Sequence, residues 1–586
     1  MNPLPRISHI RQNLLIYIVL AVGLLVRLAL MHLRWINPDE GAHLMDAKLL
    51  LQGSMPVADF GSRQPFYVLL LAVLLKCFGS SLLVGRMLPL ISSLAAGWMI
   101  FLIGKKLFDY QTGLIAMSIY LFLPLTLIWS VIVKTEQPTI FLACASVYFL
   151  LLSRSGHIRK SGWIILSGIF SALAFYVRQP ALYMPLAIVL FLSFKKQESV
   201  LERVRLIGLF VLGYFSIVLL CFALLSVRMS WQEIFFSQLN PLHLVWNRLA
   251  SVFGMLPPSQ AVVDTPGFRL LDQPMEYTLT AWQQSFLFCL FIIAAAVFRI
   301  ALRKEGDDKR ATGSENFVLL FIFWACSVLA LYLFQTANRG FYTQYFTEAL
   351  PPLVLLASAF FNKIYGRHVS LTKMVFPLVL FFFIFVTQRL FWHIFPGMVF
   401  YLAFALVGAG TLTSVRFKLS LREKIFGAAI LPLALTVVFY PLELLTRSTA
   451  WPLVAAFITG YYFMVRFFKN KSSIAPAGEK TFAASYIMIA AFLISAAFSG
   501  HVIGPRYEAI WSQKTLKQVA GTLARLSDNN SEVLSGGTIW AFQAGLDPFL
   551  KVPHPTEFFK KLDSNFQMQF RNNRPDFIIL DGYTER

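Results

Sequence analysis

Two short polar segments beside long apolar stretches contain the carboxylates best placed for chemistry. The first is 38–43, with the sequence PDEGAH, and the second is 134–138, with the sequence KTEQP. A carboxylate within hydrogen-bond reach of a hydroxyl can accept its proton while the oxygen attacks an electrophile. Asp39, Glu40 and Glu136 are therefore the candidate catalytic residues.

Each of these carboxylates also has a structural explanation. Asp39 follows a proline and could cap the helix that residues 39–53 predict. Glu136 could pair with the lysine two positions before it or cap the helix that follows. Glu40 and His43 lie three residues apart and share one helix face, where His43 could contact a substrate or bond a neighbouring side chain.

Arginines and tyrosines recur at the edges of the apolar segments. Arg63 and Tyr67 lie in SRQPFY, at the start of one of them. The other candidates for substrate binding are Arg86, Arg178, Arg339, Tyr342 and Tyr345. A guanidinium offers a fixed fork of donors that suits phosphate, although each arginine could instead anchor a helix at the membrane interface.

No cofactor is required by the sequence. Two carboxylates could hold a divalent cation, but no cluster of ligands demands a metal. The five cysteines lie singly inside apolar segments, which predicts neither a disulfide framework nor a zinc site.

The composition indicates a polytopic membrane protein. Of 586 residues, 57% are hydrophobic and 14% are charged, whereas soluble domains have about 25% charged residues. Apolar runs of about 18 or more residues recur along the chain. The net charge of +22 is explained by basic residues in cytoplasmic loops, so we expect no nucleic-acid partner.

The apolar run 65–78 decides the predicted topology. Its 14 residues reach only about 21 Å at 1.5 Å per residue, whereas the hydrocarbon core is about 30 Å thick. We therefore predict an interfacial or re-entrant helix there. All basic clusters from Lys105 to Lys471 then fall on one side, which is the cytoplasmic side.

Fifteen spans follow, in a fold of about 13–15 transmembrane helices. They are 13–33, 88–104, 112–129, 138–153, 163–177, 180–194, 206–227, 282–302, 317–335, 349–362, 374–387, 394–414, 425–444, 450–468 and 482–500. This odd number places the N-terminus inside and the C-terminus outside. The large external regions are 34–87, 228–281 and the tail.

Two domains are predicted. Residues 1–500 form the all-α membrane domain, and residues 501–586 form a small extracytoplasmic α/β domain. In the second domain, residues 501–526 have helical periodicity, and EVLSGGTIWAF and DFIILDG have the pattern of short strands.

The order of these features resembles the GT-C glycosyltransferases, in the protein O-mannosyltransferase and aminoarabinose transferase branch, a family-39-like group. The resemblance covers about 10–360. It rests on PDEGAH, SRQPFYVLLLAVLLKCFGSSLLVGRMLPLISSLAAG, GKKLFDYQTGLIA, KTEQPTIFLACASVYFLLL, AFYVRQPALYMPL and YFTEALPPLVLLAS. The WWDYG-type signature of oligosaccharyltransferases is absent.

The resemblance implies roles for particular residues. Asp39 corresponds to the catalytic carboxylate of the first external loop. Glu136 corresponds to an acidic residue of the second external loop, which is usually Asp in the family. Arg63 corresponds to the phosphate-contacting basic residue of a K-P-P-L-Y-like motif, which reads R-Q-P-F-Y here. Arg178 stands where the family commonly has Lys.

The resemblance also implies the reaction. A hexosyl or pentosyl group would pass, with inversion, from a polyprenyl-phosphate donor to an acceptor hydroxyl on the outer face of the plasma (inner) membrane. The acceptor would be a lipid, a protein or a cell-envelope glycan. The same arginines would also suit a transporter or flippase of an anionic lipid, which remains the alternative.

Overall fold

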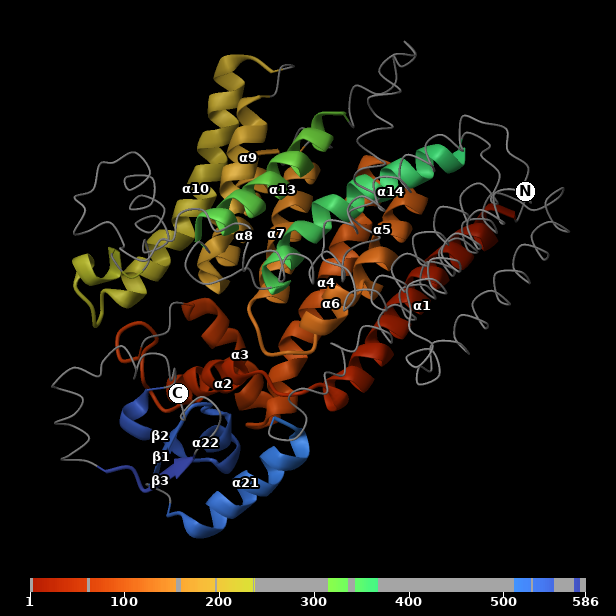
Figure 1. Cartoon of the computed structure of the whole chain (residues 1–586). Helices are drawn as coiled ribbons and strands as arrows, with labels where there is room; N and C mark the ends of the chain where they lie inside the picture. The colour runs from red at the N-terminus through yellow and green to blue at the C-terminus, as the bar shows by residue number, and fades with distance from the viewer. Residues whose placement is uncertain are drawn as a thin grey trace, which may run out of the picture. The chain divides into compact units, whose positions relative to one another are not determined.

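The computed structural model describes residues 4–60, 64–153, 160–194, 198–235, 237, 315–335, 343–366, 511–528, 531–552 and 574–579 (Figure 1). Contacts divide the chain into two units. The first comprises 1–281, 307–355 and 499–586 and contains the candidate site. The second comprises 282–306 and 356–498, of which 356–366 are described.

The PDEGAH segment begins the second of the first four helices. They are α1 (Leu4–Leu33), α2 (Pro38–Leu51), α3 (Pro65–Phe78) and α4 (Leu82–Leu107). The bounds of α3 are those of the apolar run predicted as a short helix. Its start is set by Pro65 at the first helical position, where a missing N–H costs nothing, and it ends before Gly79, whose φ is 92°.

The next elements follow the predicted spans closely, with one break. They are α5 (Tyr110–Phe122), α6 (Pro124–Trp129), α7 (Glu136–Leu152), α8 (Lys160–Val177), η1 (Gln179–Leu182), α9 (Tyr183–Ser193) and α10 (Val200–Leu225). The predicted continuous span 112–129 is divided at Leu123, which is extended with φ −61° and ψ 130°. Pro124 explains this difference, because a proline has no N–H to donate and disfavours helical backbone in the residue before it.

Later described helices fall on two more predicted spans. These elements are α13 (Glu315–Gln335), the short η2 (Thr343–Ala349) and α14 (Leu350–Gly366). The predicted spans 282–302 and those after 366 lie outside the described residues. Among described helices, three are long and apolar enough to cross a membrane, over Leu14–His32, Leu82–Leu107 and Val200–Leu225.

Glycines allow close packing between α8 and α10. A Cβ atom at Gly168 would lie 2.1 Å from the carbonyl oxygen of Phe210, and one at Gly213 would lie 2.1 Å from that of Ile165. The two glycines therefore let these helices approach backbone to backbone, as small residues do between membrane helices.

The C-terminal part is a small α/β arrangement. It contains α21 (Gln513–Leu526), β1 (Glu532–Ser535), α22 (Ile539–Ala544), β2 (Asp547–Pro548), η3 (Phe549–Lys551) and β3 (Phe577–Ile579). The strands form a parallel sheet in the order β2-β1-β3. Helix α21 has its N-cap at Ser512 and buries Leu516, Ala520 and Leu523 at helical spacing.

One sequence-based prediction for this region is wrong. The segment EVLSGGTIWAF was expected to be a strand, but only its first four residues form β1, and residues from Ile539 form α22. A short apolar run has no periodicity that separates a buried strand from a buried helix. The predicted fold class is nevertheless confirmed: a helical membrane fold with a small strand element near the C-terminus.

Candidate active site

Asp39 lies in the first turn of α2 but does not cap the helix. The N-cap is Asn37, whose side-chain oxygen accepts a hydrogen bond from the Asp39 N–H at 3.0 Å. Glu40 completes the capping box by accepting from the Asn37 N–H at 2.9 Å. The capping explanation for Asp39 is therefore wrong. Its side chain is 61% exposed and forms an ion pair with Lys134.

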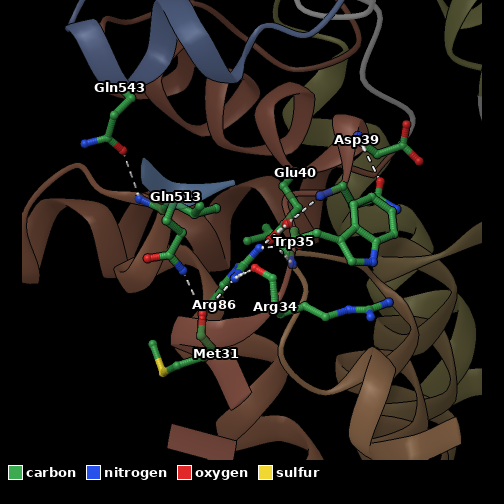
Figure 2. A network of polar contacts seen from close by, with 11 residues as sticks. Met31, Arg34, Trp35, Asp39, Glu40, Arg86, Gln513 and Gln543 are labelled. Atoms are coloured by element: carbon green, nitrogen blue, oxygen red, sulfur yellow. Dashed lines mark hydrogen bonds and ion pairs between the residues drawn. The ribbon is translucent and has the colours of Figure 1, made fainter. Parts of the chain in front are cut away.

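Glu40 is buried and accepts four hydrogen bonds. Arg86 donates two of them, from Nε at 2.8 Å and from Nη2 at 2.7 Å (Figure 2). The backbone N–H groups of Asn37 and Val133 donate the others, each at 2.9 Å. Both carboxylate oxygens are thus fully occupied by protein donors.

Arg86 uses its remaining donors on the end of α1. Nη1 donates to the carbonyl oxygens of Met31 at 2.7 Å and Arg34 at 3.2 Å, and Nη2 donates to that of Trp35 at 3.0 Å. A guanidinium has five N–H donors, and all five are engaged. Glu40 and Arg86 were expected to be a catalytic and a substrate-binding residue, respectively. This geometry favours a structural role for both.

The Glu40–Arg86 clamp, as we call this buried pair, fixes the residues on either side of Asp39. It joins the end of α1, the start of α2, helix α4 and the segment before α7. Because α2 starts from this clamp, Asp39 is held on a rigid element although its own carboxylate is exposed.

Lys134 faces Asp39 from the segment before α7. Its side chain is buried, which opposes a positive charge, but the carboxylates of Asp39 and Glu136 outweigh this and raise the pKa of Lys134. The ammonium group therefore stays charged at neutral pH. A positive charge beside a carboxylate in turn favours its ionised form.

Glu136 belongs to a second buried network that centres on Arg178. Arg178 Nη1 lies 2.6 Å from Glu136 Oε1 and 3.0 Å from Thr135 Oγ1, and its Nε lies 2.8 Å from Glu348 Oε1. These contacts join the start of α7, the residue after α8 and η2. The other oxygen of Glu136 has no hydrogen-bond partner within the described part of the chain.

Tyr67 and His43 lie against each other. Their ring centroids are 5.1 Å apart in an edge-to-face arrangement, which is a favoured geometry for aromatic pairs. Tyr67 is fully buried, and its hydroxyl has no hydrogen-bond partner among described residues. The pair connects α2 to α3.

Four predicted site residues take no part in the contacts above. Arg63, Arg339 and Tyr342 lie outside the described residues, and Tyr345 lies in η2. Within the described part of the chain, no group of three or more His, Cys, Asp or Glu side chains is placed to hold a metal ion.

Sequence reasoning missed two members of the site. Lys134 was considered only as a partner for Glu136, and Glu348 was not singled out. A signal for Glu348 does exist: like Glu136, it lies just before a proline at the start of an apolar helix. The positive end of the helix dipole stabilises an acidic side chain in that position, and a buried carboxylate also needs a cation as its counter-charge.

Part of the chain matches a known family model. Residues 62–231 match the model described as dolichyl-phosphate-mannose-protein mannosyltransferase. No curated protein matches the sequence.

Solved structures show similarity over nearly the whole chain. ArnT from Cupriavidus metallidurans bound to undecaprenyl phosphate matches with a TM-score of 0.56 and 13% identity, over 95% of this chain and 88% of that one. The apo state of the same protein matches with a TM-score of 0.53 and 12% identity, over 95% of this chain and 94% of that one. Together with the family model, these similarities confirm the predicted resemblance: the chain has a GT-C glycosyltransferase fold.

Proposed function

We propose that this protein is an integral membrane glycosyltransferase that transfers a sugar from a polyprenyl-phosphate donor to an acceptor hydroxyl. The observation that carries the proposal is the exposed Asp39 carboxylate, held at the start of α2 beside the buried cation Lys134. The fold supports it as well, because the similar ArnT structure contains undecaprenyl phosphate.

Asp39 would act as the general base. The acceptor hydroxyl gives its proton to the Asp39 carboxylate while its oxygen forms a bond to the anomeric carbon of the sugar. The bond from that carbon to the phosphate oxygen breaks, and the polyprenyl phosphate leaves with the electron pair. One displacement of this kind inverts the anomeric configuration, and it needs no covalent enzyme intermediate.

The leaving phosphate requires fixed cations, since negative charge develops on it as the bond breaks. Arg63 is our candidate for this contact, because it comes just before α3 in the sequence. Arg339 is a second candidate. Arg178 is already engaged by Glu136 and Glu348, so we assign it to the positioning of Glu136, whose second oxygen would orient the acceptor or a cation.

We further propose the location of the reaction. The active site and residues 501–586 would face outside the plasma membrane, with the N-terminus in the cytoplasm. A polyprenyl chain stays in the bilayer, so the reacting bond has to lie at the interface, where Asp39 and the short helix α3 would be. A divalent cation would not be required for transfer, and activity in a chelator tests this point.

The decisive experiment uses purified protein in detergent with a panel of polyprenyl-phosphate sugars. We expect one sugar to be transferred or slowly hydrolysed, with release of free polyprenyl phosphate and a product of inverted anomeric configuration. A flippase would leave every donor intact, because detergent micelles have no second leaflet. Intact donors across the panel, with all acceptor classes supplied, would refute the glycosyltransferase proposal.

A further inference from the structure

The C-terminal part of the chain packs directly on α2, the helix that carries Asp39. Figure 1 shows α22 beside α2. At Gly41 the approach is so close that a Cβ atom would lie 2.2 Å from the backbone nitrogen of Ile539 and 2.7 Å from its Cα. A glycine is unfavourable inside a helix, and here the close approach of another backbone explains it.

Lys48 makes the second contact, near the end of α2. Its Nζ donates at 2.8 Å to the carbonyl oxygens of Gly545 and Leu546 and to Asp547 Oδ1. These carbonyls follow α22, whose C-cap is Gly545, so Lys48 places a positive charge at the negative end of that helix. An ammonium has three donors, and all three are used on the C-terminal part.

Asp547 is held by this contact in turn. It accepts a further hydrogen bond from Gln52 Nε2 at 3.1 Å. Partial burial opposes its charge, but the hydrogen bonds from Lys48 and Gln52 and the nearby positive charges outweigh this and lower the pKa of Asp547. The ion pair is therefore formed at neutral pH.

A third set of contacts reaches the last turn of α1 and the segment between α1 and α2. The Ile36 N–H donates to the Trp511 carbonyl at 2.8 Å. Gln513 Nε2 donates at 2.9 Å to the carbonyl of Met31, the same oxygen that Arg86 contacts at 2.7 Å (Figure 2). The C-terminal part thus shares an acceptor with the Glu40–Arg86 clamp.

We propose that residues 511–528 and 531–552 are a positioning element of the active site. They hold the chain just before α2 at Ile36, and they hold α2 itself at Gly41 and at Lys48. In this way they fix the distance between Asp39 and Lys134. The inference rests on the proposed function of Asp39. Lys48, Gly41 and Gln513 act through α2 and are positioning residues. A misplacement of about 1 Å far from the chemistry can reduce turnover about a hundredfold.

The test compares Lys48→Met with Lys517→Met in the full-length protein. Lys517 lies on the exposed side of α21. Its replacement by Met removes the same charge as Lys48→Met does. We expect kcat to fall between tenfold and a hundredfold in Lys48→Met, with KM for the donor unchanged and with partial rescue in Lys48→Arg. Lys517→Met should behave like wild type. An unchanged kcat in folded Lys48→Met protein would overturn the proposal.

Two further measurements keep the test decisive. Gln513→Leu removes the contact to the carbonyl of Met31 in the last turn of α1, which leads into α2, and serves if Lys48→Met does not fold. A labelling assay needs no activity: Asp39→Cys is introduced where the five natural cysteines are replaced, and its reaction with a hydrophilic thiol reagent is timed. Lys48→Met should change this rate and Lys517→Met should not. An equal rate in both would overturn the positioning role even if no sugar transfer were found, whereas absent transfer alone would refute only the proposed function.

Discussion

Arg86 uses all five of its N–H donors in hydrogen bonds. Two of these bonds form a bidentate ion pair with Glu40, which lies 46 residues earlier in the sequence. The pair is fully buried. It connects helix α4 to the turn between α1 and α2, so the backbone that leads into Asp39 is fixed by a side chain whose donors are all used within the protein.

Glu40→Gln should destabilise the fold strongly, because it leaves the buried charge of Arg86 without a counter-charge. Removing one partner of a buried ion pair costs about 3–5 kcal/mol. We expect a large loss of monodisperse protein in size-exclusion chromatography and a lowered unfolding temperature in detergent. Arg86→Lys, which keeps the charge, should also destabilise the fold, since a lysine has three donors instead of five. Normal stability of Glu40→Gln would contradict a structural role for the clamp.

Asp39→Asn should have the opposite pattern: normal folding and little turnover. Asn37 forms the cap and the Asp39 side chain is largely exposed, so the exchange leaves α2 intact. A general base contributes about 10²–10⁴-fold to the rate, and we expect a loss in that range with unchanged donor affinity. Sugar transfer from a purified lipid donor is the measurement. Transfer near the wild-type rate would show that Asp39 is not the base.

Arg63→Ala should impair use of the donor much more than Arg63→Lys. A hydrogen bond to a charged group is worth about 1.5–3 kcal/mol, which corresponds to a tenfold to hundredfold loss in kcat/KM. Lysine keeps the charge and should retain part of the activity. The measurement is kcat/KM for the polyprenyl-phosphate sugar. Equal values for wild type and both variants would mean that Arg63 only anchors the start of α3 at the interface.

The sequence predicted local features of this fold well. The bounds of α3 follow from a proline before an apolar run and a glycine after it, and α2 begins with a capping pattern close to the predicted helix start. The break at Pro124 could also have been read from the sequence, because the proline rule is local. In the tail, a short apolar run gave no basis for choosing helix over strand at α22.

Partners across the fold could not be predicted. Glu40 and Arg86, or Arg178 and Glu348, are far apart in the sequence, and periodicity places a residue on a helix face without saying what that face meets. The same limit hid the role of Gly41, which only the position of Ile539 explains. Sequence patterns selected most charged residues of the site, though not Lys134 or Glu348, and the structure was needed to separate the buried clamp from the exposed carboxylate.

Two glycines of α10 should differ in their tolerance of substitution. Gly213→Ala introduces a Cβ that overlaps the Ile165 carbonyl, whereas a Cβ at Gly208 on the same helix meets nothing within 4 Å. Overpacking costs about 1–3 kcal/mol, so the unfolding temperature should fall in Gly213→Ala. Gly208→Ala is the matched control and should be neutral or slightly stabilising, since alanine favours helices. Equal effects would mean that α8 and α10 do not pack through Gly213.

Lys134→Met should shift the pH dependence of turnover. Lys134 lies beside Asp39, and its own pKa is raised by Asp39 and Glu136 despite burial, so it carries its charge throughout the neutral range. Removing a positive charge beside a carboxylate disfavours the ionised form of that carboxylate. Because a general base must be ionised to accept a proton, the acidic limb of the kcat profile should move to higher pH, and turnover should recover as the pH rises.

Lys134→Arg keeps the charge and should keep the acidic limb near its wild-type position, which separates the electrostatic effect from a change in packing. A limb that stays in place in Lys134→Met, with transfer measured from pH 4 to 9, would show that another group than Asp39 accepts the proton.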